Sequence, residues 1–153
     1  MKRDNETRAD NQQERLFYAG WIVGFVDGEG CFSVSIFRNK KTRFGWQIFP
    51  EFVVTQGERS IQVLYDLKSY FLCGNVFINR RHDNHREAVH RYCVRSLQDL
   101  ESHIIPFFRQ YELKTDKQQD FIQFAKIVAL MREQKHFSKQ GLCSIAQLVG
   151  KTI

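Results

Sequence analysis

The feature that most constrains the fold is an apolar segment over residues 16–30, which ends in acidic residues alternating with glycines. Its apolar part contains Gly20 and Gly24, which are four positions apart and therefore lie on one face of a helix. Without side chains on that face, another helix can approach closely. We predict a helix over about residues 12–30, whose C-terminal half is apolar all round and should be buried on every side. It should stop at Asp27-Gly28-Glu29-Gly30, where the glycines permit backbone angles that other residues resist.

Length and composition fit one globular domain. The chain has 153 residues, of which 42% are hydrophobic and 26% charged, and this balance excludes an intrinsically disordered chain. We expect a polar arm over residues 1–11, followed by a single domain over residues 12–153. No apolar run approaches the roughly 20 residues that span a bilayer, and residues 1–15 lack the apolar core of a secretory signal. We therefore expect neither a membrane protein nor a secreted one.

Hydrophobic periodicity predicts two hairpins, each followed by helical sequence. Apolar and polar residues alternate, as in strands, over residues 31–37, 46–55, 76–81 and 88–95. Apolar residues recur at helical spacing over residues 59–72 and again from Ser96, and two more helices are expected towards the C-terminus. The order α-ββ-α-ββ-α-α-α predicts an α+β fold, in which helices cover one face of an antiparallel sheet and leave the other face open.

Positive charge is concentrated on the predicted sheet. Residues 31–95 carry 11 Lys and Arg against 5 Asp and Glu, a net charge of +6, which equals the formal net charge of the whole chain. A local basic surface is typical of nucleic-acid binding, although a solvated charged face has the same composition. A curved sheet with a polar and basic open face also fits a groove of duplex DNA.

Residues 22–30, with the sequence IVGFVDGEG, resemble the LAGLIDADG motif of homing endonucleases. The apolar helix before this motif, the alternating strand after it and the α-ββ-α-ββ-α order also resemble the family, over about residues 12–130. The resemblance implies the single-motif, intron-encoded type, which acts as a homodimer with its two motif helices packed at a two-fold axis. On this interpretation, Gly20 and Gly24 form the dimer interface.

The resemblance assigns a metal site to the end of the motif. Glu29 stands at the second acidic position, which in the family binds a divalent cation such as Mg²⁺, and the backbone carbonyl of Gly28 stands where the family supplies a further ligand. A carboxylate that ends an apolar helix is expected to be desolvated, and a hard cation bound by oxygens offsets that cost. Asp27, at the first acidic position, is expected to stabilise the turn or cap a neighbouring helix.

Two further catalytic candidates follow from local similarity to the family. Gln56 ends the segment FVVTQ, which resembles the end of the family's second strand, and it would position the attacking water. Lys114 follows Leu113, a pair that resembles the family's basic position near the scissile phosphate, and it would stabilise phosphate charge. Lys117 is the alternative to Lys114 for this role.

Sequence recognition is expected from the open face of the sheet and from the turn between the first two strands. Arginine suits guanine in the major groove, and glutamine or asparagine suits adenine. The expected DNA-reading residues are Ser33, Ser35, Phe37, Asn39, Lys41, Gln47, Phe49, Phe77, Asn79, Arg81, Arg91 and Arg95.

These features together predict a homodimeric, site-specific endonuclease that cuts double-stranded DNA. The reaction would be Mg²⁺-dependent hydrolysis of one phosphodiester in each strand of a long pseudo-palindromic site, and the resemblance implies 3′ overhangs. The alternatives are an intron RNA maturase, which binds its intron RNA, and a DNA-binding regulator that does not cleave. The expected location is a chloroplast or mitochondrion if the gene is organelle-encoded, and the cytoplasm otherwise.

Overall fold

The structure is a computed structural model that describes residues 2–79 and 88–151, with side chains from Asn11 to Ile78 and from Ala88 to Lys151. Its strands are β1 (Gly30–Arg38), β2 (Trp46–Gly57), β3 (Asn75–Asn79) and β4 (Val89–Val94). Its longer helices are α1 (Lys2–Glu29), α2 (Ile61–Phe71), α4 (Ile105–Gln110), α5 (Lys117–Arg132) and α6 (Lys139–Val149). Short helical segments join them, namely η1 (Glu58–Ser60), α3 (Leu97–Asp99), η2 (Leu100–Ile104) and η3 (Lys135–Phe137).

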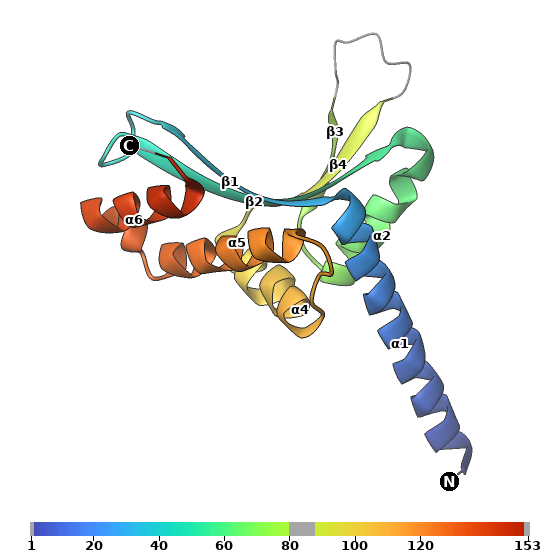
Figure 1. Ribbon diagram of the computed structural model, residues 1–153. Helices are drawn as coiled ribbons and strands as arrows, with labels where there is room; N and C mark the ends of the chain where they lie inside the picture. The colour runs from blue at the N-terminus through green and yellow to red at the C-terminus, as the bar shows by residue number, and fades with distance from the viewer. Residues whose placement is uncertain (1, 80–87, 152–153) are drawn as a thin grey trace.

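The four strands form one antiparallel sheet in the order β1-β2-β4-β3, and α2, α4, α5 and α6 lie on one side of it (Figure 1). The predicted α+β class and element order are confirmed. The pairing register decides which side chains share a face. Phe32 lies opposite Phe52, and Phe52 lies opposite Val94, so these three buried residues all point towards the helices. Their sequence neighbours point to the open face.

Aromatic side chains build the main core between the sheet and the helices. The ring centroid of Phe32 lies 5.0 Å from that of Phe52, 5.3 Å from that of Phe108 and 5.2 Å from that of Phe121. All four side chains are buried. Such ring pairs add about 0.5–1.5 kcal/mol each beyond their burial. The core therefore fixes β1 and β2 against α4 and α5, the two helices whose connecting loop reaches the end of α1.

Helix α1 differs from the prediction in its start and in its burial. It begins at Lys2, so residues 2–11, which we expected to form a polar arm, continue the same helix. Its C-terminal half buries Ala19, Ile22 and Val26, whereas Phe17 on the opposite side is 76% exposed. The N-terminal half projects from the body of the molecule (Figure 1). The expected burial on every side is therefore wrong for the single chain, which covers only one side of α1.

The end of α1 is set by close packing and not by unusual backbone angles. The helix continues through Glu29, and neither Gly28 nor Gly30 has a positive φ, which corrects our expectation for these glycines. A Cβ at Gly30 would lie 2.9 Å from the backbone oxygen of Val26 and 2.5 Å from its side chain. Glycine at this position therefore lets β1 leave the helix without a clash.

Candidate active site and nucleic-acid interface

Asp27 ties the end of α1 to the loop between α4 and α5. Its carboxylate accepts hydrogen bonds from the backbone N–H groups of Lys114 (2.7 Å) and Thr115 (3.3 Å), and from the Thr115 hydroxyl (2.8 Å). These contacts join segments that are 87 and 88 positions apart in the sequence. The contacts agree with the stabilising role expected for Asp27, since they fix the approach to α5.

The same contacts favour the ionised form of Asp27. Burial by itself raises the pKa of this carboxyl. The hydrogen bonds from Lys114 and Thr115, together with the positive charge of Lys117, outweigh that effect and lower the pKa of Asp27 below its ordinary value. The carboxylate is therefore charged at neutral pH and fully available as an acceptor for the loop.

Lys117 closes the C-terminal end of α1. Its Nζ donates to the backbone carbonyls of Val26 (2.9 Å) and Asp27 (2.8 Å). The last carbonyls of a helix lack partners within the helix and carry partial negative charge, so a lysine at this point is stabilising. Lys114 contributes its backbone N–H to Asp27, but its side chain is exposed. Of the two candidate lysines, Lys117 is the one whose ammonium group lies at the end of the motif helix.

Glu29 is the last residue of α1, and its side chain is exposed. The expectation that this carboxylate is desolvated is therefore wrong for the single chain. Gly28 is also exposed, and a Cβ built on it meets no atom within 4 Å, so the space around this end of the helix is open. A carboxylate and a backbone carbonyl are oxygen donors of the kind that Mg²⁺ prefers. The donor set at residues 28 and 29 therefore fits a hard divalent cation.

Gln56 lies at the same end of the sheet as Glu29. Gly30 pairs with Val54, so the residues that follow Val54 run alongside the end of α1. Gln56 is half-buried and pairs with His90 of β4. His90 is buried, and neither ring nitrogen has a hydrogen-bond partner in the described part of the chain. The register therefore places Gln56, with the unpaired imidazole of His90 beside it, near the end of the motif helix.

The open face of the sheet carries most of the predicted DNA-reading residues. Those in β1 and β2 are Ser33, Ser35, Phe37, Gln47 and Phe49, all exposed or half-buried. The register pairs Ser35 with Phe49 and Phe37 with Gln47, and it pairs Phe77 of β3 with Arg91 of β4. Because side chains alternate along each strand, the register places these pairs on one face of the sheet. Arg81 lies outside the described residues, and Asn79 is described by its backbone alone.

Asn39 organises the turn between β1 and β2. Its Nδ2 donates to Oε1 of Gln47 at 2.6 Å, and its Oδ1 accepts from the backbone N–H of Lys41 at 3.0 Å. The side chain of Lys41 is exposed. Asn39 therefore positions Gln47 and Lys41, two other predicted DNA-reading residues, and both ends of its amide are hydrogen-bonded within the protein.

Glu51 is a component of this face that the sequence interpretation missed. It is only 8% exposed, although it lies on the open face, opposite Ser33. Its carboxylate accepts a hydrogen bond from Nη2 of Arg91 at 3.1 Å and a second from Nε of Arg95. The alternation along β2 was a sufficient signal for its position, because Glu51 falls between Phe49 and Val53 in the outward-facing series.

The side of α1 that carries Gly20 and Gly24 is open. A Cβ built on either glycine meets no atom within 4 Å. Phe17 is 76% exposed and Trp21 is 42% exposed on the same side, and they line an apolar hollow with Leu16. The predicted interface residues therefore lie on an uncovered apolar face of the helix.

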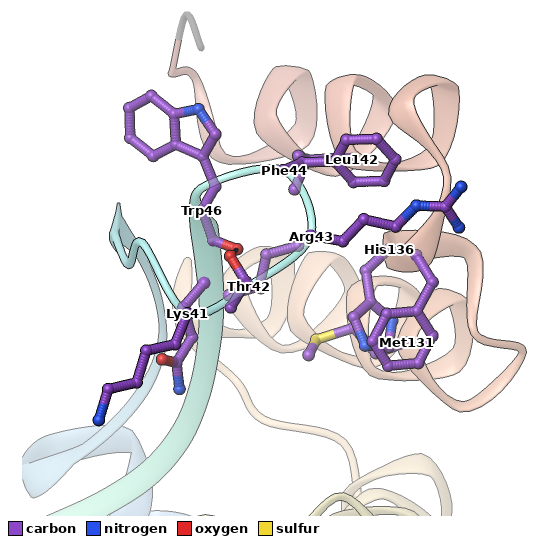
Figure 2. Close-up of a pocket in the computed structure, with 11 residues that line it drawn as sticks. Lys41, Thr42, Arg43, Phe44, Trp46, Met131, His136 and Leu142 are labelled. Atoms are coloured by element: carbon purple, nitrogen blue, oxygen red, sulfur yellow. Dashed lines mark hydrogen bonds between the residues drawn. The ribbon is translucent and has the colours of Figure 1, made fainter.

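A pocket of about 500 Å³ lies at the other end of β2, between the β1–β2 turn and the segment from α5 to α6 (Figure 2). Figure 2 shows the side chains of Arg43 and Lys41 extending in opposite directions, and the guanidinium carbon of Arg43 lies 5.3 Å from the ring centroid of Phe44. Aromatic and aliphatic side chains form most of the wall, and no carboxylate of the described residues lines it. This pocket lacks the oxygen donors of the motif end and is separate from it, so it is not the candidate active site.

Two absences characterise the described part of the chain. None of the helices in residues 2–79 and 88–151 combines the length and hydropathy that crossing a membrane requires. Within the same residues, no group of three or more His, Cys, Asp and Glu side chains is arranged to hold a metal ion. The candidate metal donors at residues 28 and 29 are therefore one side chain and one backbone oxygen.

The family description "LAGLIDADG endonuclease" matches residues 22–128 of the chain. A structure of the homing endonuclease I-TnaI is 37% identical, with a TM-score of 0.76, and the match covers 88% of each chain. A structure of the meganuclease I-SmaMI bound to uncleaveable DNA is 30% identical, with a TM-score of 0.79, and the match covers 86% of this chain and 43% of the other.

Curated relatives are longer than this chain. The "Probable intron-encoded endonuclease 2" of Neurospora crassa is 34% identical over 128 residues, which are 83% of this chain and 27% of that protein. The DNA endonuclease I-CeuI of Chlamydomonas moewusii is 28% identical over 87% of this chain and 58% of its own length. The chain therefore spans between about a quarter and three fifths of these two proteins.

Proposed function

Because the chain belongs to the LAGLIDADG endonuclease family, we propose that it is a site-specific endonuclease acting on double-stranded DNA. One observation carries the proposal: the exposed carboxylate of Glu29 ends the motif helix at the point where the open, polar face of the sheet begins. A face of this kind can lie along a DNA groove while the carboxylate meets the phosphate backbone.

In the proposed reaction, the Glu29 carboxylate and the Gly28 carbonyl hold a divalent cation, for which we propose Mg²⁺. When bound, such a cation activates water and stabilises charge on the phosphoryl group. Gln56 would orient the attacking water. The water oxygen bonds to phosphorus, the bond from phosphorus to the 3′ oxygen breaks, and that oxygen leaves as a hydroxyl.

We propose Lys117 as the lysine that offsets phosphate charge during this step. The support is the position of its Nζ, 2.9 and 2.8 Å from the last carbonyls before Gly28. Lys114, the other candidate, has an exposed side chain and lines a hollow with Gly24 and Asp27. Asp27 holds the loop that carries Lys114 and leads into α5 at Lys117, so either assignment depends on the same anchor.

We further propose that the chain works as a homodimer through the open face of α1. Gly20 and Gly24 leave room for a second motif helix, and Phe17 and Trp21 supply apolar surface beside them. Two-fold pairing would bring two Glu29 carboxylates together, one for each DNA strand, on a long pseudo-palindromic site. Cutting across the minor groove would leave 3′ overhangs.

Gly20→Leu should reduce the mass found by sizing in solution from that of a dimer to that of a monomer.

The gene is proposed to lie in an organelle intron. Several similar proteins are named as intron-encoded, and one of them is the "Uncharacterized 50.9 kDa protein in ND4 intron 1" of Podospora anserina. An intron-borne gene of this type needs an endonuclease that recognises a long and rare sequence. The width of the open face, which extends over four strands, suits that need.

The decisive experiment is selection of cleaved sites from a random duplex library in Mg²⁺, with the wild-type chain and Glu29→Gln side by side. The wild type should enrich one site and cut both strands. Glu29→Gln should bind that site while its cleavage falls by more than about 100-fold, because even the outer partners of metal ligands contribute about 10–100-fold. Glu133→Gln, an exposed carboxylate at the far end of α5, is the charge-matched control.

Two results would contradict the proposal in different ways. Binding without cleavage by the wild type would indicate a non-cleaving regulator. Undiminished cleavage by Glu29→Gln would remove Glu29 from the reaction and leave the family assignment intact.

A further inference from the structure

Glu51 holds two arginines together at the centre of the open face. Its carboxylate accepts from Nη2 of Arg91 at 3.1 Å and from Nε of Arg95. The register explains this geometry. Phe52 pairs with Val94, so one step further along the two strands Glu51 stands beside Arg95. Because Glu51 is 8% exposed, it is sheltered by the side chains that it binds.

Arg95 is fixed on more than one side. Its guanidinium carbon lies 5.1 Å from the ring centroid of Phe77 and 5.7 Å from that of Phe49. The rings of Phe49 in β2 and Phe77 in β3 thus lie beside the guanidinium group of Arg95, which directly follows β4. Its ion pair with Glu51 uses Nε, so the edge of the guanidinium formed by Nη1 and Nη2 is not used by that bond. This edge can make a two-pronged contact with O6 and N7 of guanine, the pairing that arginine commonly forms in the major groove.

A carboxylate is an unexpected group on a surface that must approach phosphates. It offsets one of the two positive charges of Arg91 and Arg95, and the three side chains together carry a net charge of +1. Non-specific affinity comes from positive charge near phosphates, whereas specific contacts come from fixed donors at base edges. Glu51 reduces the positive charge and fixes the arginine donors. This arrangement favours discrimination between DNA sequences over affinity for any DNA.

We propose that Glu51 is a specificity-determining residue, which positions Arg95 to read a guanine and restrains the non-specific binding of the arginine pair. This inference rests on the proposed function, since it needs the open face to contact DNA. Glu51 acts through Arg95 and is therefore a positioning residue. It is not expected to form the base contact itself.

The test compares Glu51→Gln with wild type in selection from a random duplex library and in binding to the selected site and to a scrambled duplex. Glutamine has the same shape, so the fold should be kept, and thermal unfolding checks this. Discrimination at one guanine position should fall by about tenfold, the scale of a lost two-pronged contact. Binding to the scrambled duplex should tighten, and the slope of log K against log salt should become steeper by about one.

Two further variants separate positioning from charge. Glu133→Gln removes the same charge from the exposed end of α5 and should change neither the preferred bases nor the salt slope. Arg95→Lys keeps the positive charge but loses the planar fork. It should lose preference at the same base pair as Glu51→Gln, and the double variant should lose little more than either single one.

The outcomes distinguish this inference from the proposed function. If wild type selects a site but Glu51→Gln keeps its base preference and salt slope, the inference fails and the endonuclease proposal stands. Loss of preference at a different base pair from that of Arg95→Lys would indicate direct reading by Glu51 and would also overturn it. If wild type selects no sequence from the library, both proposals fail.

Discussion

The motif end and the open face of the sheet are held by different kinds of contact. At the motif end, side chains bond to backbone atoms: Asp27 to the N–H groups of Lys114 and Thr115, and Lys117 to the carbonyls of Val26 and Asp27. On the open face, side chains bond to side chains, as in Glu51 with Arg91 and Arg95 and in Asn39 with Gln47.

The two kinds of contact should respond differently to substitution. A side chain that bonds to backbone holds the path of the chain, so its replacement alters the positions of the elements themselves. Pairs of side chains on a sheet surface can be exchanged while the strands keep their register. The contacts at the motif end therefore hold elements of the fold in place, whereas those on the open face hold side chains in place.

Lys117→Met, a change at the motif end, should have the largest effect on cleavage and stability. It leaves the carbonyls of Val26 and Asp27 without their lysine donor, which should lower the free energy of unfolding by about 1–3 kcal/mol. Cleavage, measured well below the unfolding temperature, should fall by about 100-fold or more, as for other groups that stabilise transition-state charge. Single-turnover cleavage and thermal unfolding are the two measurements.

Lys114→Met is the matched control for Lys117→Met. Its side chain is exposed, so stability should change by no more than about 0.5 kcal/mol, and cleavage should change little. If Lys114→Met instead abolished cleavage at unchanged stability, the active-site role would return to Lys114.

Asp27→Asn tests the anchor of the motif end through pH. The folded-state pKa of Asp27 is lowered by its hydrogen bonds, below the value of about 3.9 for an unfolded aspartate. Its stabilisation is therefore full above that unfolded value and is lost as the pH falls through it towards the folded one. Asp27→Asn should cost about 1–2 kcal/mol at pH 7, and less at pH 3. Denaturant unfolding at both pH values measures this, and an equal cost at both would contradict the assignment.

Arg91→Ala should have the most local effect, and of these variants' effects on stability it should be among the smallest. It removes one partner of Glu51, which keeps its bond to Arg95. Preference at one base pair should relax, at a cost of roughly 1–3 kcal/mol in specific binding, while the unfolding temperature stays nearly constant. Competition binding with single-base variants of the selected site measures this. A uniform loss across all sequences would identify Arg91 as a phosphate contact.

Much of the fold could be predicted from the sequence because it depends on local periodicity. Alternation over residues 31–37 and 46–55 located β1 and β2, and helical spacing located α2 and α5. The assignment of Glu29 and Gly28 to a metal site stays a prediction. Several statements about α1 were wrong. The helix starts at Lys2 and not near residue 12, one of its sides is open, Glu29 at its end is exposed, and that end needs no unusual glycine backbone angles. Hydrophobic periodicity indicates how apolar each side of a helix is. It does not indicate whether the same chain or a second chain packs against that side.

The sequence by itself determined which residues alternate, which recur at helical spacing, and where a carboxylate follows an apolar helix, because these properties depend on neighbours along the chain. Only the tertiary structure decided that Lys117 reaches Val26, that Asp27 holds the loop before α5 and that Glu51 joins Arg91 to Arg95. These partners lie 40 to 91 positions apart. Their meeting depends on how the helices pack on the sheet and on the register of its strands, and no local pattern encodes either.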